Sequence, residues 1–366
     1  MANIKFNLSL CVLFIINIKI CFGENEVPLV RVKQGLIRGI QEESLNGKKF
    51  FSYMSIPFAE PPVGKLRFRD PVPSKSWDGE LDGTKMPVDC LQINILESMA
   101  QKQPSLNIVG REDCLHLNVY TSVPNSPEKK LPVMVFIHGG GFVFGAAHQY
   151  PPHALMNKDI VFVVIQYRLG IFGFLSTEDS VIPGNMGLKD QQLALKWIKE
   201  NINAFGGDPD RITIFGESAG GASVNYQILS PGSKGIMNIY IKTKDFFARA
   251  IMQSGTSICP WASNKDHRKF AIETGHQFNC SIEIGSEKYL ECMQNVNSYY
   301  LVIAGSWSRV IEYLEPSVKQ IINDKFEEAG PAYFSFRDEE HPLELSKQVL
   351  RYYLQREDIT LTDEDK

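Results

Sequence analysis

The sequence predicts an α/β fold with a mostly parallel central sheet, and two observations support this prediction. Apolar runs at residues 133–137, 160–167 and 212–215 have the length and composition of buried parallel strands, and residues 250–253 form a candidate fourth strand. Residues 190–205 show the apolar spacing of an amphipathic helix and are followed by Gly206-Gly207, a natural helix stop. A strand, a helix and a strand in succession indicate parallel strands joined by crossover helices.

Residues 1–23 come first in the chain and have the pattern of a secretory signal peptide. Lys5 precedes an apolar run at residues 10–16, and Gly23 stands before three polar residues. A membrane anchor is the alternative, but Asn17 and Lys19 interrupt the run well short of the roughly 20 apolar residues that a span requires. We therefore expect a secreted protein, cleaved near Gly23, in which residues 24–366 form a single domain without a membrane span.

The composition excludes several classes of function. The chain is 43% hydrophobic and 22% charged, which is ordinary for a globular protein. Its net charge of -4 provides no basic surface for nucleic acid and no polybasic tether for lipid. No CxxC pair or histidine cluster indicates a zinc site. We expect no metal, no other cofactor and no nucleic-acid partner.

The cysteines indicate a disulfide-bonded protein. Two of the seven lie in the signal segment, and the others are Cys90, Cys114, Cys259, Cys280 and Cys292. In an oxidising compartment this number fits two disulfides and one free thiol. Proximity in sequence favours pairing the first two and the last two. Asn279 begins the sequon Asn-Cys-Ser and is a candidate glycosylation site.

A triple-glycine loop follows the predicted strand at residues 133–137. It reads His138-Gly139-Gly140-Gly141-Phe142. Such a loop can direct backbone N–H groups at a developing negative charge. A phosphate-binding loop is the alternative, but it would need G-x-G-x-x-G or a lysine followed by serine or threonine, and neither is present.

The predicted strand at residues 212–215 leads directly into Gly216-Glu217-Ser218-Ala219-Gly220. A serine between a strand and a helix, with a glycine two residues to either side, has the pattern of a nucleophile elbow. The turn is so tight that larger side chains at Gly216 and Gly220 would clash. A glycine-rich turn with an incidental serine is the alternative. The two glycine motifs, each after its own strand, favour an ester hydrolase in which the Ala219 N–H is a further donor.

Several motifs together resemble those of the type-B carboxylesterase and cholinesterase family. Besides the loop and the elbow they lie at residues 56–62, 67–69, 112–118, 167–170 and 184–191, and the resemblance extends from about residue 30 to residue 292. It implies an α/β-hydrolase fold, a small-molecule ester substrate, Ser218 as the nucleophile, and an oxyanion hole of Gly140, Gly141 and Ala219.

The resemblance also implies a set of structural pairs. The expected disulfides are Cys90–Cys114 and Cys280–Cys292, and the expected buried ion pairs are Arg67–Glu112 and Arg168–Asp190. We interpret these ion pairs as structural rather than catalytic.

The chain departs from the family pattern after the elbow. In that family the catalytic acid and then the histidine follow the serine, and we find neither motif after Ser218. Residues 309–312 resemble the segment before the acid, but residues 315–354 resemble a later helical region of insect esterases, and residues 236–245 resemble an insertion. We expect a truncated relative with an incomplete sheet and doubtful activity. His341 is a candidate base, with an exposed loop histidine as the alternative.

Two functions fit these observations. The first is a serine carboxylic ester hydrolase that forms an acyl-enzyme on Ser218. The second is a non-catalytic binding or adhesion protein of the same fold, because a fold alone does not fix function. The retained serine favours the first. Choline esters are disfavoured as substrates, because the segment between Cys90 and Cys114 contains no aromatic residue to face a quaternary ammonium.

Overall fold

The computed structural model describes residues 28–94, 107–233, 246–263 and 266–313, with side chains to residue 305. The predicted signal peptide, the insertion-like residues 236–245, the helical region after residue 315 and the candidate base His341 lie outside these ranges.

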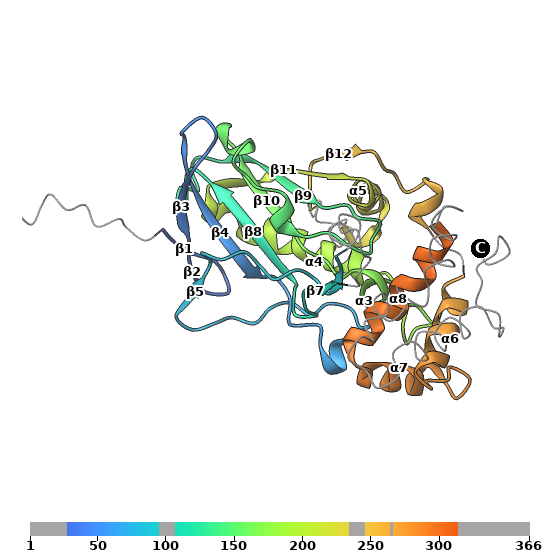
Figure 1. Cartoon of the computed structure of the whole chain (residues 1–366). Coiled ribbons are helices and arrows are strands. Elements are labelled where there is room, and N and C mark those ends of the chain that lie inside the picture. Colours follow the sequence, from blue (N-terminus) through green and yellow to red (C-terminus); the bar gives the residue numbers. More distant parts are fainter. Residues whose placement is uncertain (1–27, 95–106, 234–245, 264–265, 314–366) are drawn as a thin grey trace, which may run out of the picture.

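The described residues form a mixed sheet of seven strands (Figure 1). In spatial order these are β12 (Arg249–Gln253), β11 (Gly207–Glu217), β9 (Leu131–Ile137), β10 (Val161–Ile165), β8 (His116–Thr121), β4 (Lys49–Pro57) and β3 (Ile40–Glu43). Neighbours from β12 to β10 are parallel, and β8, β4 and β3 continue the sheet with antiparallel pairs. The predicted α/β fold and its parallel strands are therefore confirmed.

The inner parallel strands β9, β10 and β11 lie between two layers of side chains, whereas the edge strand β12 is mostly exposed. Alternate residues of a strand face opposite sides of the sheet. Val133, Val135 and Ile137 of β9 pack with α4 (Met186–Asn201) in the larger core, whereas Phe136 joins a smaller cluster on the other side. Each such fully buried aliphatic side chain contributes about 1.5–3 kcal/mol to folding.

Helix α4 begins four residues before the predicted start and ends at Asn201, four residues before the predicted end at residue 205. A 3-10 helix, η5 (Ile202–Phe205), continues it, and Gly206 ends the segment in the left-handed conformation, with φ of 78°. A glycine adopts this conformation without the steric cost of a Cβ atom.

The remaining elements flank the large sheet. Figure 1 shows the small sheet of β1, β2 and β5 at one end of the molecule and helices α6, α7 and α8 at the other. Their bounds and those of the other short elements are β1 Leu29–Arg31, β2 Leu36–Arg38, β5 Glu80–Asp82, β6 Gln92–Ile93, β7 Ile108–Val109, α3 Gly170–Phe174, α5 Ala219–Leu229, α6 His267–Gln277, α7 Ser286–Asn295, α8 Ser298–Tyr313, and the 3-10 helices η2 Gly64–Leu66, η3 Ala147–Gln149, η4 Leu155–Asn157, η6 Pro231–Ser233 and η7 Pro260–Ala262.

The structure contains the expected cross-links. Disulfides join Cys90 to Cys114 and Cys280 to Cys292, and Cys259 is a free thiol. The side chains of Arg67 and Glu112 form an ion pair at 2.6 Å, and those of Arg168 and Asp190 form another at 2.7 Å.

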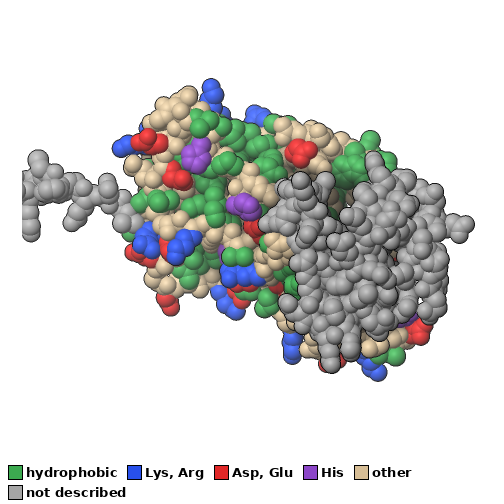
Figure 2. All heavy atoms as spheres, in the orientation of Figure 1, with side chains coloured by type: hydrophobic (Ala, Val, Ile, Leu, Met, Phe, Trp, Pro, Cys, Tyr) green, Lys and Arg blue, Asp and Glu red, His purple; other side chains and the backbone are tan. Residues whose placement is uncertain are grey.

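Figure 2 shows acidic and basic side chains interspersed over the visible part of one face. None of the helices within the described ranges has both the length and the apolar character needed to cross a bilayer.

Candidate active site

Ser218 lies at the sharp turn between β11 and α5. Its backbone has φ of 55° and ψ of -120°, a conformation that a residue with a side chain adopts only when its surroundings impose it. Two hydrogen bonds impose it here. The Ser218 N–H donates to the Gln253 carbonyl of β12 at 2.8 Å, and the Ser218 carbonyl accepts the Ala222 N–H at 3.0 Å. The serine side chain itself is only partly buried.

The two glycines of the elbow are required by close backbone contacts. A Cβ atom on Gly216 would lie 2.5 Å from the Gly220 carbonyl, and one on Gly220 would lie 2.0 Å from the Ile137 carbonyl oxygen. Real Cβ atoms essentially never come this close to another heavy atom. The predicted clash at both positions is therefore confirmed.

The glycine loop packs directly against the elbow. A Cβ atom on Gly139 would lie 2.6 Å from the Glu217 carbonyl oxygen and 3.2 Å from the Ser218 Cβ. The next two glycines have φ values of 100° and 59°, and the Gly140 carbonyl accepts the N–H groups of Val143 and Phe144 at 3.0 and 3.1 Å. The loop therefore turns back on itself immediately beside the serine.

This turn leaves backbone donors unpaired. Within the described ranges, the N–H groups of Gly140 and Gly141 donate to no protein acceptor. Ala219 is the first residue of α5, and its N–H has no acceptor within the helix because of its position. Unpaired N–H groups beside a serine hydroxyl can stabilise an oxyanion.

His138 supports the loop from inside the protein. Its ring is completely buried and stacks on Tyr167 with the ring centres 4.4 Å apart. Nδ1 lies 2.9 Å from the Gly139 carbonyl oxygen, so Nδ1 carries the proton in the neutral ring. Burial lowers the pKa of His138 to about 4, so the ring is neutral at physiological pH. The Tyr167 hydroxyl donates to the His138 carbonyl at 2.9 Å.

Two other described histidines contact carboxylates rather than the serine. His148 contacts Asp89 at 2.9 Å, and His153 contacts Glu42 at 3.6 Å. His116 is partly buried, and this desolvation lowers its pKa. No hydrogen bond in the described part of the chain joins a histidine to the Ser218 hydroxyl. The described residues also contain no group of three or more His, Cys, Asp or Glu side chains suited to a metal ion.

A cavity of about 280 Å³ opens beside the glycine loop. Phe142, the residue after the third glycine, lines it together with Phe174, Leu188 and Tyr226, and Asn185 and His267 add polar groups. The two phenylalanine rings meet edge to face, 5.2 Å between centres. The lining is mostly apolar, and such cavities bind the apolar parts of small molecules.

The model of the carboxylesterase family matches residues 26–347. The chain is 42% identical over 288 residues to venom carboxylesterase-6 of Apis mellifera, covering 79% of this chain and 49% of that protein. It is 39% identical over 334 residues to the juvenile hormone esterase of Tribolium castaneum, covering 90% of this chain and 53% of that protein. It is 42% identical over 279 residues to esterase FE4 of Myzus persicae, covering 75% and 46%. The chain spans about half the length of these relatives.

Proposed function

This chain belongs to the carboxylesterase family, and on that basis we propose that it hydrolyses carboxylic esters through an acyl-enzyme formed on Ser218. One observation carries the proposal: three N–H groups, on Gly140, Gly141 and Ala219, have no acceptor among the described residues and belong to segments that pack against or include Ser218.

The reaction begins when the Ser218 oxygen attacks the ester carbonyl carbon. The electron pair of the carbonyl moves onto its oxygen, and the three N–H groups donate to that oxyanion. When the carbonyl re-forms, the bond from its carbon to the alcohol oxygen breaks, the proton lost by the Ser218 hydroxyl passes to that oxygen, and the acyl group stays on Ser218. Water then releases the acid and regenerates the hydroxyl. Each donor contributes roughly 3 kcal/mol to the transition state.

The substrate we propose is a neutral ester with an apolar acyl or alcohol part. The apolar cavity beside Phe142 supports this part of the proposal. The segment from Cys90 to Cys114 offers no aromatic ring for a quaternary ammonium, which disfavours choline esters. Relatives named as juvenile hormone esterase and pyrethroid hydrolase indicate that similar chains act on different esters.

The cellular setting we propose is extracellular. Two disulfides suit an oxidising compartment, and residues 1–23 have the sequence pattern of a cleaved signal, which leaves residues 24–366 as one domain. Asn279 is exposed and directly precedes Cys280, so we propose it as a glycan acceptor.

A fluorophosphonate probe tests the central proposal. The probe reacts with an activated serine, and we expect a single adduct on Ser218 that Ser218→Ala abolishes. The matched control is Ser126→Ala, which removes another partly exposed serine located before the start of β9. The proposal is wrong if the chain is not labelled, or if Ser218→Ala is labelled as fast as the parent. Unlabelled protein would favour the non-catalytic binding protein.

A further inference from the structure

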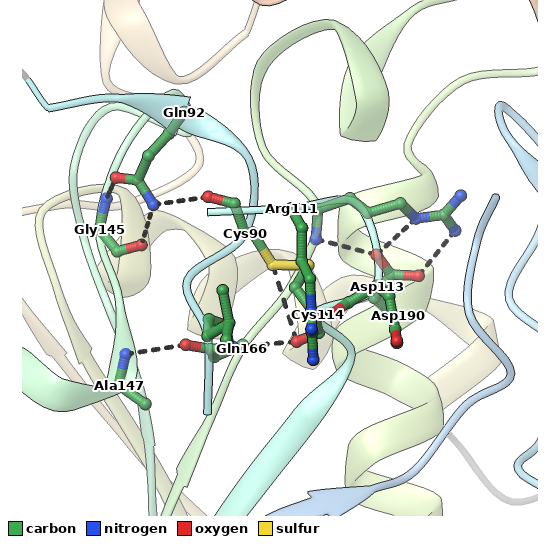
Figure 3. Close-up of a disulfide and its surroundings, with 11 residues drawn as sticks. Cys90, Gln92, Arg111, Asp113, Cys114, Gly145, Ala147, Gln166 and Asp190 are labelled. Carbon is green, nitrogen blue, oxygen red and sulfur yellow. Dashed lines mark hydrogen bonds and ion pairs between the residues drawn. A yellow bond between two sulfur atoms is a disulfide. The ribbon is translucent and has the colours of Figure 1, made fainter. Parts of the chain in front are cut away.

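The Cys90–Cys114 disulfide segment and the glycine loop are joined by buried side-chain amides (Figure 3). Gln92 belongs to β6, two residues after Cys90, and Gln166 follows the end of β10. Both side chains are at least 95% buried. Each joins the disulfide segment to a residue that follows the glycine loop, which is Gly145 for Gln92 and Ala147 for Gln166.

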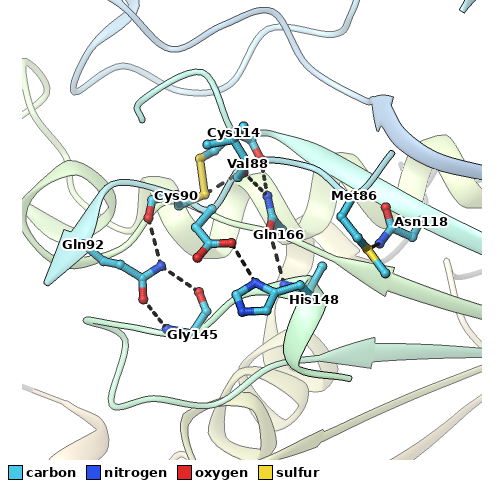
Figure 4. Close-up of polar contacts among 11 residues, drawn as sticks. Met86, Val88, Cys90, Gln92, Cys114, Asn118, Gly145, His148 and Gln166 are labelled. Atoms are coloured by element: carbon cyan, nitrogen blue, oxygen red, sulfur yellow. Dashed lines mark hydrogen bonds and ion pairs between the residues drawn. A yellow bond between two sulfur atoms is a disulfide. The ribbon is translucent and has the colours of Figure 1, made fainter. Parts of the chain in front are cut away.

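Gln92 pairs with both backbone groups of one glycine. Its Oε1 accepts the Gly145 N–H at 2.8 Å, and its Nε2 donates to the Gly145 carbonyl at 3.0 Å and to the Cys90 carbonyl at 2.9 Å. The two bonds to Gly145 occupy both hydrogen-bonding groups of its backbone. Figure 4 shows this pairing beside the disulfide. The position of Gly145 is therefore fixed relative to Cys90.

Gly145 in turn lies against the first peptide of the glycine loop. Its φ is 118°, and a Cβ atom there would lie 2.4 Å from the His138 Nδ1 and 2.7 Å from the Gly139 carbonyl oxygen. The Gly139 carbonyl and the Gly140 N–H belong to one planar trans peptide, so they point in opposite directions. Whatever holds the carbonyl toward His138 also sets the direction of the Gly140 N–H.

We propose that Gln92 is a positioning residue for the oxyanion hole. It holds Gly145 against the His138–Gly139 contact, so that the Gly140 N–H faces the oxyanion that forms on the ester. This inference rests on the proposed function. Gln166 supports the neighbouring residues, because its Oε1 accepts the Ala147 N–H at 3.3 Å and its Nε2 donates to the Cys114 carbonyl at 2.9 Å.

The test measures the rate of Ser218 phosphonylation by a fluorophosphonate as a function of probe concentration. For Gln92→Ala we expect the maximal rate constant to fall by about 10- to 100-fold, with the half-saturating concentration changed less than about twofold, because a misdirected donor affects the transition state. A purely structural role would reduce the fraction of protein that can be labelled and leave the rate constant of the folded fraction unchanged.

The matched control is Asn201→Ala at the end of α4. The Asn201 side chain is also buried and also joins two backbone groups, accepting the Lys33 N–H and donating to the Trp197 carbonyl, each at 3.0 Å. It lies before the start of β11, whereas Ser218 follows the end of that strand. We expect its maximal labelling rate constant to match that of the parent chain.

A second variant covers the case in which Gln92→Ala does not fold. Gln92→Met keeps nearly the same volume and removes the three hydrogen bonds, and we expect the same slowing. A parental rate constant in either folded variant would overturn the positioning role and leave the proposed function standing. A parent chain that is never labelled on Ser218 would overturn both.

Discussion

Arg168 and Asp190 form a two-point ion pair that is closed to solvent. The guanidinium Nε and Nη2 donate to the two carboxylate oxygens at 2.8 and 2.7 Å, and the Arg168 backbone N–H donates to the same carboxylate at 3.0 Å. The two side chains are 3% and 0% exposed. The pair joins the segment after β10 to α4, the crossover helix that leads to β11 and Ser218.

Asp190→Asn is expected to lower the free energy of unfolding by about 3–5 kcal/mol, because it leaves the Arg168 guanidinium buried without a counter-charge. Urea unfolding followed by tryptophan fluorescence measures this change. The neighbouring Lys189→Ala is the control. Lys189 pairs with Asp70 at 2.5 Å on the surface, and its loss should cost less than about 1 kcal/mol. Equal losses for the two variants would contradict the prediction.

Gly220→Ala should destabilise the elbow severely. The new methyl group would lie 2.0 Å from the Ile137 carbonyl oxygen, and backbone cannot move aside as the end of a side chain can. We expect a loss of at least about 2 kcal/mol and no labelling of Ser218. Gly64→Ala is the control, since Gly64 has φ of 55° and nothing within 4 Å of its added Cβ. It should cost only the conformational strain of about 1 kcal/mol. If Gly220→Ala is as stable as Gly64→Ala, the steric account is wrong.

Much of the site could be predicted because its requirements are local. Glycine is required at positions 216 and 220 because one turn is too tight for a Cβ atom. The unpaired N–H donors belong to the glycine loop and to the first residue of the helix that follows Ser218. The parallel strands were predictable because buried strands are continuous apolar runs. The antiparallel strands β3, β4 and β8 were not, because polar and charged residues are interspersed with their apolar ones.

The support behind the loop could not be predicted, because it depends on tertiary contacts. Gln92 and Gly145 are 53 residues apart, and nothing in the sequence of either indicates the other. His138 was predictable as part of the glycine loop, but its contact with Gly139 and its burial on Tyr167 appear only in the folded chain. The glycine at position 145 is the one local signal, since its φ of 118° favours glycine.

The two disulfides should stabilise the chain similarly and affect labelling differently. They close loops with sequence separations of 24 and 12 residues, and each is expected to contribute about 3 kcal/mol. Replacing Cys90 and Cys114 by alanine frees the segment that carries Gln92, so we expect slower phosphonylation of Ser218 in the folded protein. Replacing Cys280 and Cys292 removes a cross-link near α6 and α7 and should leave the rate constant unchanged. Unfolding by urea and labelling kinetics on both double variants test this. The same rate constant in both would contradict the prediction.

The burial of His138 predicts a pH dependence of stability. Its pKa is about 4 in the folded chain, against an ordinary value of 6.5 in the unfolded chain. Above pH 6.5 the ring is neutral in both states and the stability is fully present. As the pH falls from 6.5 to 4 the unfolded chain takes up the proton first, so the free energy of unfolding falls. This residue alone should account for about 3 kcal/mol, with no further change below pH 4.

The variant His138→Asn isolates this contribution from all other titrating groups. Asparagine can still donate to the Gly139 carbonyl from a position close to that of Nδ1, but it does not titrate. We expect the parent chain to lose about 3 kcal/mol more than the variant between pH 7 and pH 4, measured by urea unfolding at each pH. The loss of ring stacking on Tyr167 lowers the stability of the variant at every pH and therefore cancels from this difference. Parallel pH profiles for the two proteins would show that the His138 ring takes up its proton in the folded chain as readily as in the unfolded one. The prediction that burial behind the glycine loop lowers the pKa of His138 would then be wrong.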